Sequence, residues 1–182
     1  MDSKTKENVF KLDVVSIRLV KDAPILSDKR LDSPLSVVSV LGDIMSELDR
    51  EVICIINLKA DNTPINVNFA SVGALNEAMA HPRELLKASI LSNAASVIMV
   101  HCHPSGKLLP SKADTMFTDR MSKVCELVGI PLLDHLIVGG DNNYFFSYKE
   151  KGLIKNERQT YLTDYRDIQL DNSKVAERGR SR

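Results

Sequence analysis

The chain has 182 residues, of which 43% are hydrophobic and 26% are charged. These values are ordinary for a globular protein, and the length allows one domain with a hydrophobic core plus extensions. Lysine and arginine together number 24, as do aspartate and glutamate, so the formal net charge is zero. The neutral charge argues against strong non-specific binding to nucleic acid through a general basic field, and the absence of tryptophan limits base stacking. Nucleic acid is an unfavoured partner, although a local basic patch stays open.

The cysteines do not indicate a disulfide framework or a zinc knuckle. Cys54, Cys102 and Cys125 are odd in number and lack Cys-x-x-Cys spacing. The first residues are polar and contain no apolar signal core, and no run of 18 apolar residues occurs. We expect three buried thiols, a reduced cytoplasmic compartment and no association with a membrane.

Hydrophobic periodicity and turn residues predict alternating helices and strands. Ser33 followed by Pro34 is typical of a helix start, with an N-cap and a proline at the first helical position. The continuous apolar run Val52–Leu58 is typical of a central strand, and Gly129 is a suitable helix stop. The elements expected, in chain order, are a strand over 14–20, a helix over 34–49, strands over 52–58 and 65–69, a helical or irregular stretch over 74–80, a helix over 82–93, a strand over 96–101, a helix over 111–128, a strand over 132–138, a hairpin turn over 139–143 and a strand over 144–148. This order predicts an α/β domain with a mixed sheet and flanking helices.

One stretch concentrates residues that suit metal chemistry. A buried apolar strand ends in His101-Cys102-His103. Because side chains alternate faces along a strand, the two histidines point the same way and Cys102 points opposite. A loop with proline and glycine follows, and Ser111 and Asp114 open the next helical pattern. Two imidazoles, one carboxylate and an open fourth position are the ligand set of a catalytic zinc site.

Each part of this stretch also has a simpler interpretation. A His-x-His pair alone is weak evidence for a metal. Ser111-x-x-Asp114 before an apolar period is, by itself, a helix N-cap with an acidic residue in the first turn. Residues 104–106 are compatible with an ordinary turn. The combination of strand, paired histidines, tight loop and helix-start carboxylate favours the metal site, and capping is compatible with it.

The spacing resembles a known motif. His101-x-His103-Pro-Ser-Gly, then Ser111 and Asp114, is similar to the motif of the JAMM (MPN/JAB) metalloprotease family, in particular its RadC-like branch. Further matching segments are His81-Pro-Arg-Glu84, Ser92-Asn-Ala-Ala95 and Leu133-Asp-His-Leu-Ile-Val-Gly139. The resemblance covers about residues 47–150.

The resemblance implies an architecture and a division of the chain. It implies a three-layer α/β/α fold of the cytidine-deaminase-like type, with the zinc hydrolase domain over residues 34–153. Residues 1–33 form an N-terminal extension, and the charged tail over residues 154–182 is expected to be partly disordered. RadC-like proteins commonly carry a helical region before this domain, and residues 1–46 do not match it.

The resemblance also implies roles for individual residues. It implies that Zn²⁺ is bound by His101, His103 and Asp114, that Glu51 carries the proton as general base and acid, and that the Ser111 hydroxyl stabilises the oxyanion. Glu51 matches the family's glutamate because it directly precedes an early central strand.

Three other residues need placing. Glu47 is a rival to Glu51, but its place on a predicted helix favours a solvated side chain. His135 matches the Asp-His pair of the family and is expected in the core or beside the ligands, not as a fourth ligand. His81 precedes a proline at a predicted helix start and is expected to begin that helix.

Competing sites are judged by spacing and size. Metallo-β-lactamase-like hydrolases require Asp-His shortly after His-x-His, where this chain has Pro104-Ser105. Amidohydrolase barrels need a longer chain. A Cys102 nucleophile is disfavoured because strand alternation turns it away from the histidines. An iron oxygenase with two histidines and one carboxylate stays open on ligands alone.

Two functional classes follow. The first is a zinc metallopeptidase or isopeptidase that acts on a protein or peptide substrate. The second is a non-catalytic accessory module of the RadC family, linked to DNA repair or mobile elements. The complete set of ligands and proton carrier favours the enzyme, and a homodimer stays open.

Overall fold

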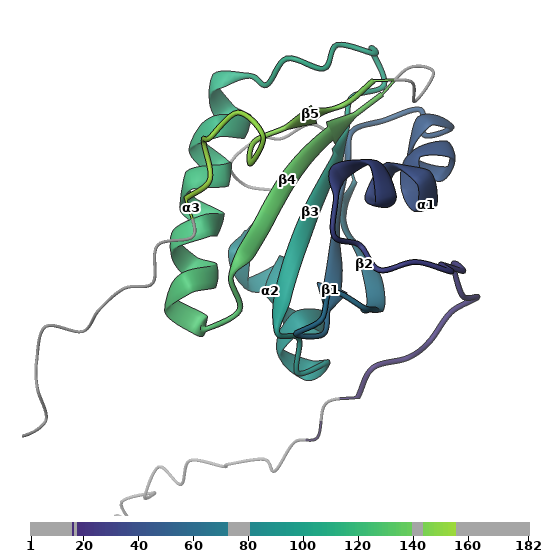
Figure 1. The fold of residues 1–182 in the computed structure, drawn as a ribbon, viewed down its shortest axis with the longest axis vertical. Helices are drawn as coiled ribbons and strands as arrows, with labels where there is room; N and C mark the ends of the chain where they lie inside the picture. Colours follow the sequence, from purple (N-terminus) through teal and green to yellow (C-terminus); the bar gives the residue numbers. More distant parts are fainter. Residues whose placement is uncertain (1–15, 17, 73–80, 140–143, 156–182) are drawn as a thin grey trace, which may run out of the picture.

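The structure is a computed structural model that describes residue 16 and residues 18–72, 81–139 and 144–155. Within these residues the chain forms three helices and five strands (Figure 1). In chain order they are α1 (Pro34–Ser46), β1 (Val52–Leu58), β2 (Pro64–Val72), α2 (Pro82–Leu91), β3 (Ser96–Cys102), α3 (Lys112–Val128), β4 (Leu132–Val138) and β5 (Phe146–Ser147). None of the described helices is long and apolar enough to cross a membrane.

The strands form one mixed sheet in the order β2-β1-β3-β4-β5. β1 runs antiparallel to both β2 and β3, β3 is parallel to β4, and β4 is antiparallel to β5. The parallel pair β3–β4 is connected through α3, as a parallel crossover requires. The predicted mixed α/β sheet is confirmed.

Helices cover both faces of this sheet and create three layers (Figure 1). Alternation along β1 sends Ile53 and Ile55 to the core beneath α2 and α3, and Cys54 and Ile56 to the core beneath α1. All seven residues of β1 and of β3 are buried. The three-layer α/β/α arrangement is therefore confirmed, and both central strands have the continuous apolar pattern of strands that are covered on two faces.

Each helix begins at a side chain that accepts a hydrogen bond from its first turn. Ser33 caps α1 in a reciprocal capping box with Ser36, and Pro34 occupies the first helical position. His81 caps α2, because its Nδ1 accepts from the Arg83 amide at 3.2 Å. The expectation that His81 begins this helix is confirmed.

The described part of the predicted strand over 14–20 is not a strand. Ser16 and residues 18–20 have no strand partner, and Val20 is 90% exposed. The alternation of apolar and polar residues there does not produce a strand, because a strand needs a neighbouring strand to pair with and a core to cover. The other residues of that prediction lie outside the described part, as do the stretch 74–80, residues 140–143 of the hairpin turn and residues 156–182 of the tail.

The remaining differences concern the ends of elements. α1 ends at Ser46 and not at residue 49, because the Leu48 amide bonds to the Met45 carbonyl in a tighter turn. β2 is longer than the predicted 65–69, and β5 is reduced to Phe146–Ser147. All three cysteines are buried and free, as predicted.

Candidate metal centre

The antiparallel pairing of β1 with β3 places the start of one strand beside the end of the other. In this register Val52 pairs with Cys102 and Ile53 pairs with His101. Glu51, the residue before β1, therefore comes next to the histidines although it is fifty positions away in sequence. A carboxylate oxygen of Glu51 and one ring nitrogen each of His101 and His103 lie within 4.8 Å of one another. We call these three residues the Glu–His–His cluster.

The two histidines project from one face of β3. Their ring centroids are 4.5 Å apart, with the planes nearly perpendicular. Cys102 points to the opposite layer, where its Sγ donates to the Met45 carbonyl at 2.9 Å. This confirms the predicted alternation and removes Cys102 from the chemistry of the cluster. The exposed Glu47 is not part of the cluster.

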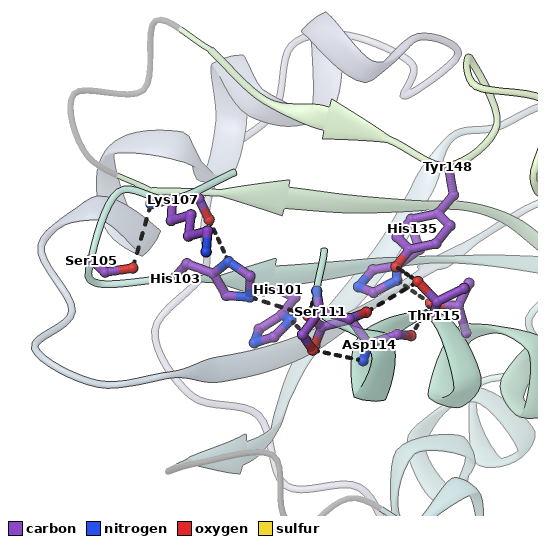
Figure 2. Close-up of polar contacts among 10 residues, drawn as sticks. His101, His103, Ser105, Lys107, Ser111, Asp114, Thr115, His135 and Tyr148 are labelled. Carbon is purple, nitrogen blue, oxygen red and sulfur yellow. Dashed lines mark hydrogen bonds and ion pairs between the residues drawn. The ribbon is translucent and has the colours of Figure 1, made fainter. Parts of the chain in front are cut away.

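A backbone carbonyl determines the tautomer of His103. Its Nδ1 lies 2.5 Å from the Lys107 carbonyl oxygen in the loop after β3 (Figure 2). Because a carbonyl oxygen can only accept, Nδ1 carries the proton and donates it. The lone pair is then on Nε2, which lies 3.6 Å from Asp114 Oδ2. A ligating histidine in proteins is usually oriented by such a bond from its other nitrogen.

His101 is fully buried, and neither of its ring nitrogens has a hydrogen-bond partner among the described residues. Burial first, and then the neighbouring His103, lower the pKa of His101 to about 4, against the opposing effect of the Asp114 carboxylate. The ring is therefore neutral near pH 7, with an unused lone pair. A buried, unpartnered imidazole beside a second imidazole and two carboxylates fits a divalent metal such as zinc.

Asp114 serves both the helix and the cluster. At the start of α3, Ser111 Oγ accepts from the Asp114 amide at 3.1 Å, and Asp114 Oδ2 accepts from the Ser111 amide at 2.6 Å. The other carboxylate oxygen, Oδ1, is 3.4 Å from His101 Nδ1, and Asp114 is 2% exposed. The capping interpretation is thus correct, and the same carboxylate faces both histidines, although Asp114 is not one of the three residues that form the Glu–His–His cluster.

The loop after His103 is held against the end of β4. The His103 amide donates to the Val138 carbonyl at 2.8 Å, and the Gly106 amide donates to the His103 carbonyl at 3.0 Å. A Cβ atom added to Gly139 would lie 2.3 Å from the His103 carbonyl oxygen. Gly139 therefore allows a close approach of two backbones at the cluster. The sequence contained Gly139 in a matching segment but gave no sign of this contact.

His135 lies behind the cluster on β4. Its Nδ1 is 2.7 Å from Thr118 Oγ1. Its ring stacks on Tyr148, with centroids 4.8 Å apart (Figure 2). It is 1% exposed, which agrees with the expected place in the core beside the ligands. Thr118 and Tyr148 were not singled out from the sequence. Thr118 follows Asp114 by one helical turn, which is a usable signal, whereas Tyr148 carries none.

Most of the chain matches a known protein family. The profile of the RadC-like JAB domain matches residues 31–153. The chain belongs to this family. The resemblance inferred from the His-x-His, Ser111 and Asp114 spacing is therefore confirmed.

Curated relatives of this RadC-like JAB protein come from bacteria and archaea. The UPF0758 protein of Clostridium beijerinckii is 40% identical over 128 residues, which cover 70% of this chain and 55% of the relative. The UPF0758 protein of Moorella thermoacetica is 40% identical over 129 residues, which cover 71% of this chain and 56% of the relative. The UPF0758 protein of Methanosarcina mazei is 37% identical over 127 residues, or 70% and 55% of the two chains. The name of these relatives states no reaction, and the chain spans about half of their length.

The family and the Glu–His–His cluster together indicate a RadC-like JAB domain with a candidate metal site. The division of labour among Glu51, Ser111 and Asp114, the identity of the metal and the domain boundaries stay predictions.

Proposed function

We propose that this protein is a zinc-dependent metallopeptidase or isopeptidase-type hydrolase that cleaves an amide bond in a protein or peptide. The observation that carries the proposal is the buried His101 ring, whose two nitrogens have no hydrogen-bond partner among the described residues. Leaving such polar atoms buried is unfavourable, so a ligand for them is expected. His103 and the Glu51 carboxylate lie beside this ring in the Glu–His–His cluster, and the Asp114 carboxylate is 3.4 Å from His101 Nδ1 and 3.6 Å from His103 Nε2.

In the proposed site His101, His103 and Asp114 hold the metal. Two imidazoles and one carboxylate leave a fourth position open, which is the pattern of catalytic zinc sites. Zinc in such a site supplies a Lewis acid and lowers the pKa of its water to about 7.

The remaining steps belong to side chains of this chain. Glu51, beside both histidines, takes a proton from the attacking water and returns it to the leaving amine. Ser111 Oγ accepts from the Asp114 amide, so its own hydroxyl hydrogen is not used by the cap. That hydrogen is available to donate to the developing oxyanion.

Metal content and hydrolysis of variants test these assignments. We expect His101→Ala and Asp114→Ala to lose zinc, and Glu51→Gln to keep zinc but lose hydrolysis of a peptide library. His81→Ala is the matched control, because it removes a histidine that caps α2 outside the cluster, and it should keep both properties. Undiminished zinc in the first two variants would refute the ligand set.

The same protein variants distinguish a peptidase from a non-catalytic accessory module. Salt-sensitive binding to DNA by a zinc-loaded chain that hydrolyses no peptide would favour the accessory module. For the enzyme, proteins that co-purify with Glu51→Gln but not with the wild type would identify the substrate.

A further inference from the structure

The two histidines of β3 are oriented in different ways. His103 is fixed by the hydrogen bond of its Nδ1 to the Lys107 carbonyl. His101 has no such bond within the described residues. Its ring lies edge-on to His103 at 4.5 Å and nearly parallel to His135, with centroids 6.1 Å apart and planes at 12°, and its Nδ1 is 3.4 Å from Asp114 Oδ1. His135 is therefore one of the groups that can orient His101.

His135 is itself firmly held on β4. Tyr148 stacks on its ring, and the amide of Tyr148 donates to the His135 carbonyl at 3.1 Å. The His135 amide donates to Asp134 Oδ1 at 2.7 Å. The side chain, the backbone and the strand thus fix the ring at one place beside His101.

Hydrogen bonding also determines the tautomer of His135. Thr118 Oγ1 lies 2.6 Å from the Asp114 carbonyl oxygen, which can only accept, so the Thr118 hydroxyl gives its hydrogen to that carbonyl. The hydroxyl must then accept from His135, so Nδ1 of His135 carries the proton. Nε2 is left with a lone pair, and it has no donor among the described residues.

The unpartnered atoms of the two rings are complementary. A neutral imidazole has one lone pair and one N–H group. If the lone pair of His101 binds a metal, its N–H group still needs an acceptor, and Nε2 of His135 is an acceptor that lacks a donor. Asp114 Oδ1, at 3.4 Å from His101 Nδ1, is the competing acceptor, but it belongs to the proposed ligand carboxylate.

Stability alone does not explain a histidine at position 135. A phenylalanine would stack on Tyr148 equally well and would bury no unsatisfied nitrogen, which costs free energy. A role for the nitrogen is therefore expected.

We propose that His135 is a positioning residue of the metal centre: Thr118 holds it in one tautomer, and its Nε2 becomes the acceptor for the His101 N–H group when a metal occupies the other ring nitrogen, a bond that is not formed among the described residues as they stand. This inference rests on the proposed metal site. It assigns to Thr118, on α3, and His135, on β4, the function that the Lys107 carbonyl performs for His103. Partners of this kind, next to the ligands, typically change metal affinity by about 10- to 100-fold when they are removed.

The test uses the full chain and two variants that alter different atoms. Thr118→Val keeps the volume and removes the hydroxyl, and His135→Phe keeps the ring and removes the nitrogens. We expect each to bind zinc about 10- to 100-fold more weakly in competition with a chromophoric chelator. The visible absorption spectrum of the cobalt(II) form should also change, because the ligand field depends on the orientation of His101. Thr118→Ser, which restores the hydroxyl, should recover both properties.

Ser39→Ala is the control. Ser39 Oγ donates to the Ser36 carbonyl in the preceding turn of α1, as Thr118 Oγ1 does to Asp114 on α3, and α1 covers the opposite face of the sheet from His135. It should bind zinc as the wild type does, and thermal unfolding shows that each variant is folded. If one of the two variants does not fold, the other decides alone.

Wild-type affinity and an unchanged cobalt spectrum in a folded Thr118→Val or His135→Phe would overturn the role of His135 while leaving the metal site intact. A wild-type chain that binds neither zinc nor cobalt would overturn the proposed function together with this inference.

Discussion

Gly139 shows how one residue can control the cluster without taking part in its chemistry. Its backbone lies so close to the His103 carbonyl that an added Cβ would be 2.3 Å from the oxygen. Real contacts of this kind do not occur, so any side chain must displace the loop that orients His103. Gly129, in contrast, has no atom within 4 Å of an added Cβ, and its requirement for glycine comes from a φ of 79°.

The two glycines give a matched prediction. Gly129→Ala should lower the free energy of unfolding by about 1 kcal/mol, through the left-handed backbone alone, and should keep zinc affinity. Gly139→Ala should lower zinc affinity about tenfold or more, because the His103 backbone has to move. Chelator competition and denaturant unfolding measure the two effects, and equal zinc affinity in both variants would contradict the role given to Gly139.

At the scale of single residues, the sequence is enough to identify side chains that can bind a metal. His101, His103 and Asp114 could be named because imidazoles and a carboxylate at that spacing suit a metal. Thr118 and Gly139 could not be given their contacts, because those depend on which strand packs against α3 and on how closely two loops approach. Such distances follow from the assembled sheet and leave no pattern along the chain.

At the scale of elements, two helices begin with the same device. Ser33 and Ser36 form a reciprocal capping box at α1, and Ser111 and Asp114 form one at α3. Only the second lies beside the Glu–His–His cluster. A comparison of the two serines therefore separates the loss of stability when a helix cap is removed from the loss of activity when the proposed oxyanion donor is removed.

We expect Ser33→Ala and Ser111→Ala to lower the free energy of unfolding by a similar amount, about 1 kcal/mol each. Only Ser111→Ala should also reduce kcat, by about 10²- to 10³-fold, as removal of one oxyanion donor typically does. Denaturant unfolding and peptide hydrolysis are measured on both variants. A Ser111→Ala enzyme with the kcat of Ser33→Ala would show that Ser111 only caps the helix.

Helices and central strands were predicted well, and the sheet edges were not. The continuous apolar pattern of β1 reflects burial on both faces, which is recorded in the sequence. At the edge, the short β5 and the unpaired residues 18–20 have similar alternation but different outcomes. A strand at an edge depends on a partner, and alternation alone does not identify one.

At the scale of the molecule, the described residues form two hydrophobic cores separated by the sheet, and each core includes a buried thiol. Cys54 lies in the core under α1, and Cys125 lies in the core under α2 and α3. Burial raises the pKa of both thiols from 9.0 to about 12. In the unfolded chain they would ionise near pH 9, so over the range from 9 to 12 the unfolded state binds fewer protons than the folded state.

The protein should therefore lose stability as the pH rises above 9. Between about pH 8 and about pH 10 each thiol should lower the free energy of unfolding by about 1.4 kcal/mol. Cys125→Ala should show a smaller loss of stability over this range, because it lacks one of the two thiols. Lysines and tyrosines titrate in both proteins, so their effects cancel in the comparison. Denaturant unfolding at the two pH values measures the difference, and identical losses in both proteins would contradict the prediction.

The bond from Cys102 to the Met45 carbonyl crosses from the strand that carries the histidines to the end of α1. Met45 is six residues before Glu51, and the connection between them is short. The thiol that faces away from the cluster thus tethers the segment that delivers the glutamate to the strand that delivers the imidazoles. The spacing between Glu51 and the two histidines is consequently influenced from the opposite side of the sheet, in the buried layer beneath α1.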